Sequence, residues 1–169
     1  MRALGLLAVA SLLAAGCGPA RVGAGGVTIR LPAGWHSLPQ PAAAPTSGVV
    51  DPVVRIVASS SPLSVRALGC QIASYAFSRR GVALVVVEWR RRYPRTRWPR
   101  RPSTFTTRTL PLDPPPAIEC FDGPGGSAQF ADHGRRFGAY VLLGRDAPAV
   151  LAARARRALD TLHVEAARQ

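Results

Sequence analysis

The sequence predicts an α+β fold, in which a mostly antiparallel β-sheet of five to seven strands packs against one C-terminal α-helix. Residues 27–31, VTIRL, alternate apolar and polar side chains, as a half-buried strand does. Residues 81–89, GVALVVVEW, are apolar on both sides, which indicates a central strand. Residues 145–164 place apolar side chains at helical spacing, so they predict an amphipathic helix that covers the sheet.

The other elements follow from local patterns. Further strands are expected at 53–59 (VVRIVAS), 103–110 (STFTTRTL, rich in β-branched residues), 127–132 (SAQFAD) and 135–144 (RRFGAYVLLG). A tight turn at His133 and Gly134 joins the last two into a hairpin. Residues 68–77, LGCQIASYAF, fit either a strand or a helical turn. In the C-terminal helix, Asp146 is expected to be the N-cap, with Pro148 in the first turn.

The N-terminus has the form of an export signal. Arg2 precedes a run from Ala3 to Ala15 that is apolar except for Ser11. As a helix this run would span about 20 Å, which is too short for a hydrocarbon core of about 30 Å. The following LLAAGC resembles the lipobox of bacterial lipoproteins, with two small residues before Cys17. The resemblance implies cleavage before Cys17 and a diacylglyceryl group on its thiol; an ordinary signal with a chance cysteine is the alternative.

These features predict the domain organisation. Residues 1–16 form a lipoprotein signal peptide, 17–26 a flexible tether, 27–165 a single α+β domain and 166–169 a tail. Two or three acyl chains anchor a protein stably where one would not. We therefore expect a lipid-anchored protein on the extracytoplasmic face of the cell membrane.

Two further cysteines agree with export. Cys70 and Cys120 are an even pair, which in an oxidising compartment predicts one disulfide; two free buried thiols are the alternative. No Cys or His pair has metal-ligand spacing, so neither a metal nor another cofactor is expected.

A basic segment follows the most apolar strand. All 22 Lys and Arg positions are arginine, and the formal net charge is +13. Pro94 and Pro99 indicate a loop rather than a helix. The candidate anion-binding residues of this loop are Arg90, Arg91, Arg92, Arg95, Arg97, Arg100 and Arg101.

Three interpretations of the basic loop compete. It could bind anionic lipid or an envelope polymer, or it could be a solvated loop that protects the apolar strand from aggregation. These two are equally supported. The interleaved Trp89, Tyr93 and Trp98 are also typical of nucleic-acid binding, but the export signal argues against a nucleic-acid partner.

No catalytic machinery can be recognised. Ser127 follows a glycine-rich stretch and Asp132–His133 lies nearby, but the nucleophile motif of a serine hydrolase is missing. A glycine-rich turn explains these residues better. The sequence therefore predicts a binding or accessory protein rather than an enzyme.

The outline resembles one family. The opening VTIRLPAGW, the antiparallel sheet and the closing ALDTLHV are similar to the PsbP/Mog1-like group, which includes small envelope lipoproteins. The resemblance implies a non-enzymatic binding or accessory role, and the arginine segment lies outside its outline. We thus expect an exported, lipid-anchored monomer with an unknown protein partner. An exported enzyme of unrecognised class is the alternative, and a nucleic-acid binder would follow if the N-terminus were not a signal.

Overall fold

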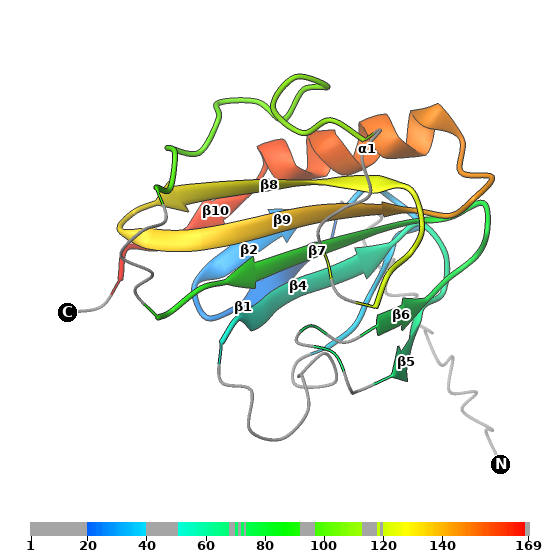
Figure 1. Cartoon of the computed structure of the whole chain (residues 1–169), viewed down its shortest axis with the longest axis horizontal. Helices are drawn as coiled ribbons and strands as arrows, with labels where there is room; N and C mark the ends of the chain where they lie inside the picture. Colours follow the sequence, from blue (N-terminus) through cyan, green and yellow to red (C-terminus); the bar gives the residue numbers. More distant parts are fainter. Residues whose placement is uncertain are drawn as a thin grey trace, which may run out of the picture.

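A computed structural model of the chain describes residues 20–39, 51–67, 70, 72, 74–91, 97–112, 118 and 120–167. The described residues form ten strands in three sheets and one C-terminal helix, which confirms the α+β class (Figure 1). The strand count exceeds the predicted five to seven because several strands have only two to four residues. The elements are β1 (Arg21–Ala24), β2 (Val27–Arg30), β3 (His36–Ser37), β4 (Val53–Ser59), β5 (Ser64–Ala67), β6 (Ser74–Ala76), β7 (Val82–Glu88), β8 (Gly125–Asp132), β9 (Arg135–Leu143), α1 (Ala149–Asp160) and β10 (His163–Val164).

The main sheet has five antiparallel strands in the order β3-β4-β7-β9-β8. Its centre is β7, whose residues from Val82 to Val87 are fully buried on both faces, as the sequence predicts. The hairpin from β8 to β9 is also confirmed, with its turn at His133 and Gly134. Both turn residues have positive φ, as a type I′ hairpin turn requires.

One apolar core lies on each face of the main sheet. On the first face, α1 and the small sheet β1-β2-β10 pack over Leu84, Val86, Phe130, Phe137 and Val141. On the second face, the β5–β6 hairpin and the loop around Cys120 cover Val85, Val87 and Tyr140. This double cover explains why a strand as apolar as β7 is stable in the centre.

The segment predicted as a flexible tether is largely part of the fold. Residues 21–24 form β1, which pairs antiparallel with β2 through a turn at Gly25 and Gly26. Both glycines have positive φ, 61° and 73°, which explains their place in the turn. The prediction of a tether over 17–26 is therefore wrong from Arg21 onward.

Two further predictions need correction. Residues 103–110 form turns instead of a strand, because the Thr106 and Thr109 hydroxyls bond to nearby backbone groups. Asp146 is not the N-cap of α1; Pro148 holds that position, and Asp146 forms an ion pair with Arg79 at 3.1 Å.

In the described part of the chain, no helix has the length and hydropathy needed to cross a membrane.

Candidate anion-binding surface

The basic loop leaves the sheet with a fixed geometry. At the end of β7, the backbone N–H groups of Arg90 and Arg91 donate to the Asp51 carboxylate, at 2.6 and 3.3 Å. Asp51 is only 7% exposed, so this contact holds the backbone firmly. The side chains of Arg90 and Arg91 themselves are exposed.

The loop returns along the outer edge of the main sheet. Pro99 accepts a hydrogen bond from the Ala131 N–H at 2.7 Å, and the Arg101 N–H donates to the Ala131 carbonyl at 3.0 Å. Arg100 thereby forms an isolated parallel bridge with Ala131 of β8. Because β8 is an edge strand, this short pairing protects part of an edge that could otherwise pair with another chain.

Arg101 differs from the other candidate arginines. Its guanidinium forms an ion pair with Asp132 at 3.0 Å and donates to the Leu162 carbonyl at 2.6 Å. Both partners belong to the folded domain. Arg101 therefore joins the loop to β8 and to the segment before β10, and its charge is already compensated.

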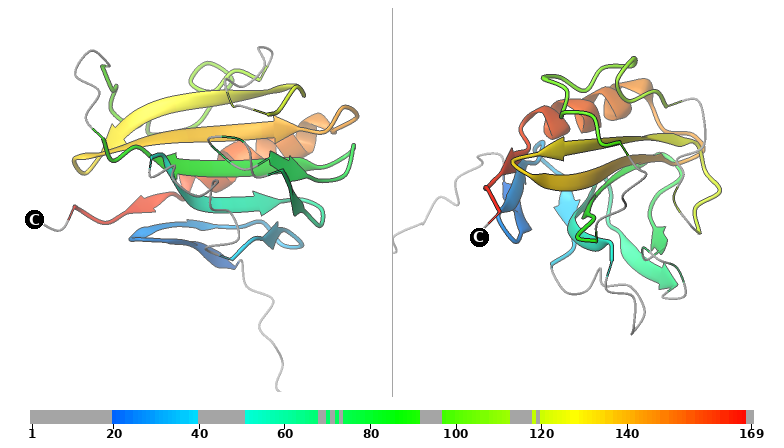
Figure 2. Two further views of the ribbon diagram at one scale, coloured as in Figure 1. Left: turned by 60° about the horizontal axis from the view of Figure 1, so that its bottom comes forward. Right: turned by 60° about the vertical axis from the view of Figure 1, so that its left-hand side comes forward.

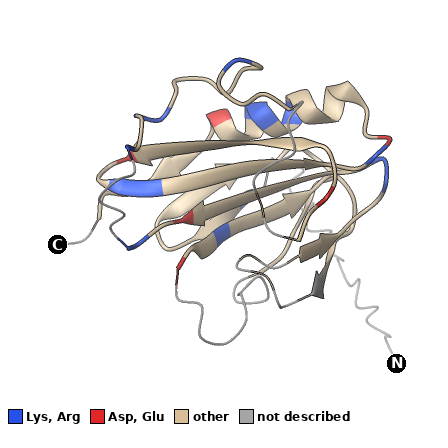
Figure 3. Ribbon diagram, viewed as in Figure 1, with Lys and Arg blue, Asp and Glu red and all other residues tan. Residues whose placement is uncertain are grey.

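The remaining described candidates form what we call the arginine surface, namely Arg90, Arg91, Arg97 and Arg100. All four side chains are exposed, and in the described residues none forms an ion pair. Arg92, Arg95 and the predicted lipid-attachment residue Cys17 lie outside the described residues. Figure 3 shows that most charged segments lie in loops, at strand ends and along α1, and that one basic segment lies within β4, the strand that contains Arg55.

A buried charge cluster lies beside the root of the loop. Glu88, at the end of β7, accepts hydrogen bonds from Arg55 Nε at 2.7 Å and from Arg135 Nε and Nη2 at 2.8 Å each. Arg135 also donates to the carbonyls of Gly25 and Glu165 and lies over the Phe137 ring. The cluster thus connects β4, β7 and β9 with the β1–β2 turn and the C-terminal segment.

The two arginines control the ionisation of Glu88. Burial alone would raise the pKa of Glu88, but the hydrogen bonds and positive charges of Arg135 and Arg55 outweigh it, so this pKa lies below its usual value. The hydrogen bond to Glu88 correspondingly raises the pKa of Arg135. The Glu88 carboxylate therefore stays ionised. The guanidinium groups of Arg55 and Arg135 that donate to it are already bound within the protein.

Sequence reasoning did not identify this cluster. A signal for it was present, because Arg55 and Glu88 are isolated charges within otherwise apolar strands. Charged side chains at such positions are stable only when they are paired. The pairing partner Arg135 lies 47 residues from Glu88, and only the strand order brings it close.

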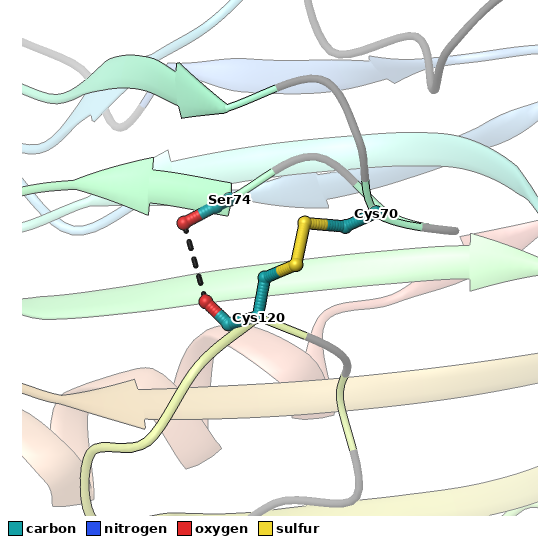
Figure 4. The surroundings of a disulfide bond; sticks show 3 residues. All are labelled: Cys70, Ser74 and Cys120. Carbon is teal, nitrogen blue, oxygen red and sulfur yellow. Dashed lines mark hydrogen bonds between the residues drawn. A yellow bond between two sulfur atoms is a disulfide. The ribbon is translucent and has the colours of Figure 1, made fainter.

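The two predicted cysteines form a disulfide on the second face of the sheet. The Cα atoms of Cys70 and Cys120 are 6.1 Å apart, and the Ser74 hydroxyl donates to the Cys120 carbonyl at 3.2 Å (Figure 4). A hollow of about 520 Å³ lies beside the bond. The stacked rings of Phe77 and Phe121, with centroids 6.2 Å apart, form part of its wall.

The other candidate chemistry is not assembled. Ser127 lies near the start of β8 and His133 follows its end, so at about 3.3 Å per residue they are about 20 Å apart. Gly126 lies in β8, where an added Cβ would collide with the Pro111 carbonyl, so close packing explains this glycine. Among the described residues, no three His, Cys, Asp or Glu side chains gather as metal ligands would.

Comparisons with protein-family models, with curated proteins and with solved structures each found no match. The similarity of the outline to the PsbP/Mog1-like group therefore stays a prediction from sequence. The site must be interpreted from its own geometry, which consists of four exposed arginines on a loop that the fold holds at both ends.

Proposed function

We propose that the protein is exported, that it is anchored through lipid on Cys17, and that its domain is a non-enzymatic binding module of the cell envelope. The N-terminal sequence MRALGLLAVASLLAAGC carries this proposal, because it combines an export signal with a lipobox-type cysteine. The Cys70–Cys120 disulfide supports it, since such bonds persist in oxidising compartments.

The arginine surface is proposed to bind an anionic polymer of the envelope. Its location supports a polymer over the lipid of the anchoring membrane. The returning limb of the loop pairs with β8, at one edge of the main sheet, whereas the chain enters through β1, which lies beside β4 near the other edge. In the left-hand view of Figure 2, β8 (yellow) and β1 (dark blue) lie on opposite sides. A domain anchored near β1 would therefore present the returning limb, with Arg97 and Arg100, to the surroundings. Arg90, at the root of the loop, borders a hollow that Gly25 and Gly26 of the β1–β2 turn also line.

The anchor is tested by mass spectrometry of the protein from membrane fractions. We expect a chain that begins at Cys17 and carries the mass of a diacylglyceryl group. The Cys17→Ala variant should lose this mass and leave the membrane fraction. A full-length product that starts at Met1, found in the cytosol without lipid, would overturn the proposal and favour a nucleic-acid partner.

Polymer binding is tested with poly(glycerol phosphate) as the probe. The fourfold variant Arg90→Gln, Arg91→Gln, Arg97→Gln, Arg100→Gln should lose most binding. A matched variant removes four exposed arginines elsewhere, Arg108→Gln, Arg145→Gln, Arg154→Gln and Arg157→Gln. It has the same net charge and should keep its affinity. Binding should weaken as salt shortens the Debye length from about 10 Å at 0.1 M to about 3 Å at 1 M. Equal losses in both variants would mean that only net charge matters.

A further inference from the structure

We infer that the outer face of the β1–β2 hairpin contacts the anionic headgroups of the anchoring membrane and so orients the domain. The outer hairpin face consists of Arg21, Gly23, Thr28, Arg30 and His163. This inference rests on the proposed acylation of Cys17. It adds a second basic surface, with a different partner from that of the arginine surface.

The connection between the proposed anchor and the fold is short. The Leu31 N–H donates to the Ala20 carbonyl at 2.7 Å, so pairing with β2 already begins at Ala20. Only Gly18 and Pro19 separate Ala20 from Cys17. Because an extended chain spans at most about 3.6 Å per residue, the Cα atoms of Cys17 and Ala20 can be no more than about 11 Å apart. An acylated Cys17 therefore keeps β1 next to the headgroups.

The strand register determines which side chains of the hairpin point outward. Val22 and Ile29 pair across the hairpin and point toward the core, where Ile29 is fully buried. Arg21 and Arg30 pair one position away, so they point to the opposite side, and both are exposed. On the other side of β2, the exposed His163 pairs with Thr28 and lies on the same outer face.

The pairing of Arg21 with Arg30 places two positive charges side by side, and a bound anion would reduce their repulsion. Side chains directly opposite each other in an antiparallel pair have Cβ atoms about 5 Å apart, and like charges there are destabilising. In the described part of the chain, neither Arg21 nor Arg30 forms an ion pair. They border a hollow of about 480 Å³ that Asp160 and His163 also line, and the Asp160 carboxylate accepts the Phe105 N–H at 2.6 Å.

A phospholipid headgroup fits these requirements. Its phosphate carries one negative charge and can accept hydrogen bonds from two guanidinium groups. The short connection limits the separation of the Cys17 and Ala20 Cα atoms to about 11 Å, which is similar to the Debye length of about 10 Å at 0.1 M salt. The attraction between the hairpin arginines and the headgroups is therefore only partly screened. A membrane contact at the hairpin would leave Arg97 and Arg100, near the other edge of the main sheet, free for their own partner.

The experiment uses the acylated chain in vesicles and measures amide hydrogen exchange of residues 21–24. Vesicles that contain phosphatidylglycerol are compared with vesicles of phosphatidylcholine alone. One arginine near an anionic membrane strengthens binding to that membrane about fivefold. We therefore expect amide exchange of residues 21–24 to be slower by about fivefold or more in the vesicles that contain phosphatidylglycerol. The Arg21→Gln, Arg30→Gln variant should lose this slowing. The matched variant Arg154→Gln, Arg157→Gln, on the exposed side of α1, should keep it.

A variant with a longer connection tests the geometric argument separately. Twelve Gly/Ser residues inserted after Cys17 should weaken the slowing, because a longer flexible connection lowers the effective concentration of headgroups at the hairpin. Mass spectrometry of each sample reports whether Cys17 is acylated. Equal exchange in both kinds of vesicle, with acylation present, would overturn the inference and leave the proposed anchor intact. A sample without lipid would overturn both. Loss of the slowing in the α1 variant would also contradict the inference, since it would indicate a net-charge effect.

Discussion

Glu88 is the counter-charge of two buried arginines, Arg55 and Arg135. Its carboxylate is shared by Arg55 and Arg135, and the side chains of all three residues are only 9–11% exposed. A buried group of paired charges adds little net free energy to stability. Removing one of its members is nevertheless strongly destabilising, because the remaining charges stay buried without a counter-charge. Glu88 therefore determines whether two arginines can stay inside the domain.

We predict that Glu88→Ala lowers the free energy of unfolding by about 3–5 kcal/mol, because it leaves the buried guanidinium groups of Arg55 and Arg135 without a counter-charge. Urea denaturation measures the change. Asp146→Ala provides the control. Both side chains of the Asp146–Arg79 ion pair are exposed, so the pair should contribute less than about 1 kcal/mol to the free energy of unfolding. Similar losses in the two variants would contradict the role assigned to the cluster.

The same residue predicts a dependence on pH. The folded-state pKa of Glu88 lies below its unfolded value of about 4.3, so its stabilising effect is fully present above that pH. The effect is lost as the pH falls through the folded pKa. The urea midpoint of the wild type should therefore drop more steeply below about pH 4 than that of Glu88→Gln. Parallel curves for the two proteins would show that Glu88 does not titrate in this way.

Among the elements, those with a clear pattern could be predicted from sequence. The structure contains the predicted strands at 53–59 and 81–89, the β8–β9 hairpin and the C-terminal helix. These elements were predictable because burial of one face gives periodic apolar residues and burial of both faces gives a continuous apolar run. The strand expected at 103–110 does not form. Its threonines favour strands by propensity, but their hydroxyls bond to nearby backbone groups and stabilise turns instead.

The missed elements left no such record. β1 has four residues, RVGA, two of which are exposed, and it is held mainly by pairing with β2. β10 has two residues and depends on the same partner. The candidate site was predictable in part: the sequence identified the arginine-rich loop. That Arg101 is paired to Asp132, and that Glu88 joins Arg55 and Arg135, depends on strand order and could not be derived from local pattern.

The disulfide is the covalent link between two elements on the second face of the sheet. It connects the loop before β6 to the segment before β8, across a sequence separation of 50. We predict that the Cys70→Ala, Cys120→Ala variant loses about 4 kcal/mol of stability, mainly because its unfolded chain is less restricted. Thermal unfolding of the wild type with and without reductant gives an independent measure. An unchanged midpoint in both experiments would mean that the bond is not formed in the native protein.

At the scale of the whole molecule, the returning limb of the loop, with Arg97 and Arg100, and the outer hairpin face lie near opposite edges of the main sheet. The arginine surface extends from the end of β7 to the edge at β8, and the outer hairpin face surrounds the entry of the chain at β1. With a net charge of +13, the whole protein would attract anions from any side. What distinguishes the two surfaces is their separation from Cys17 along the chain, because Arg21 follows Cys17 by only four positions. We therefore propose lipid as the partner of the outer hairpin face and a polymer as the partner of the arginine surface.

The first core also depends on β10, which completes the small sheet over it. Val164 is 3% exposed in the first core, whereas the adjacent His163 is exposed. We predict that Val164→Asp lowers stability by about 3–5 kcal/mol, because a carboxylate would be buried without a partner. His163→Asp places the same group one position away, in solvent, and should change the melting temperature little. A comparable loss in both variants would contradict the assigned register of β10.

The position of β2 between β1 and β10 has a consequence for how the polypeptide matures. The second strand of the domain cannot complete its hydrogen bonding until residues 163–164, far later in the chain, have been synthesised. Such a long-range requirement delays folding relative to synthesis. If the protein is exported, as we propose, the sheet of β1, β2 and β10 would still be incomplete when residues 27–30 reach the secretion channel, and it could form only after residues 163–164 had followed them.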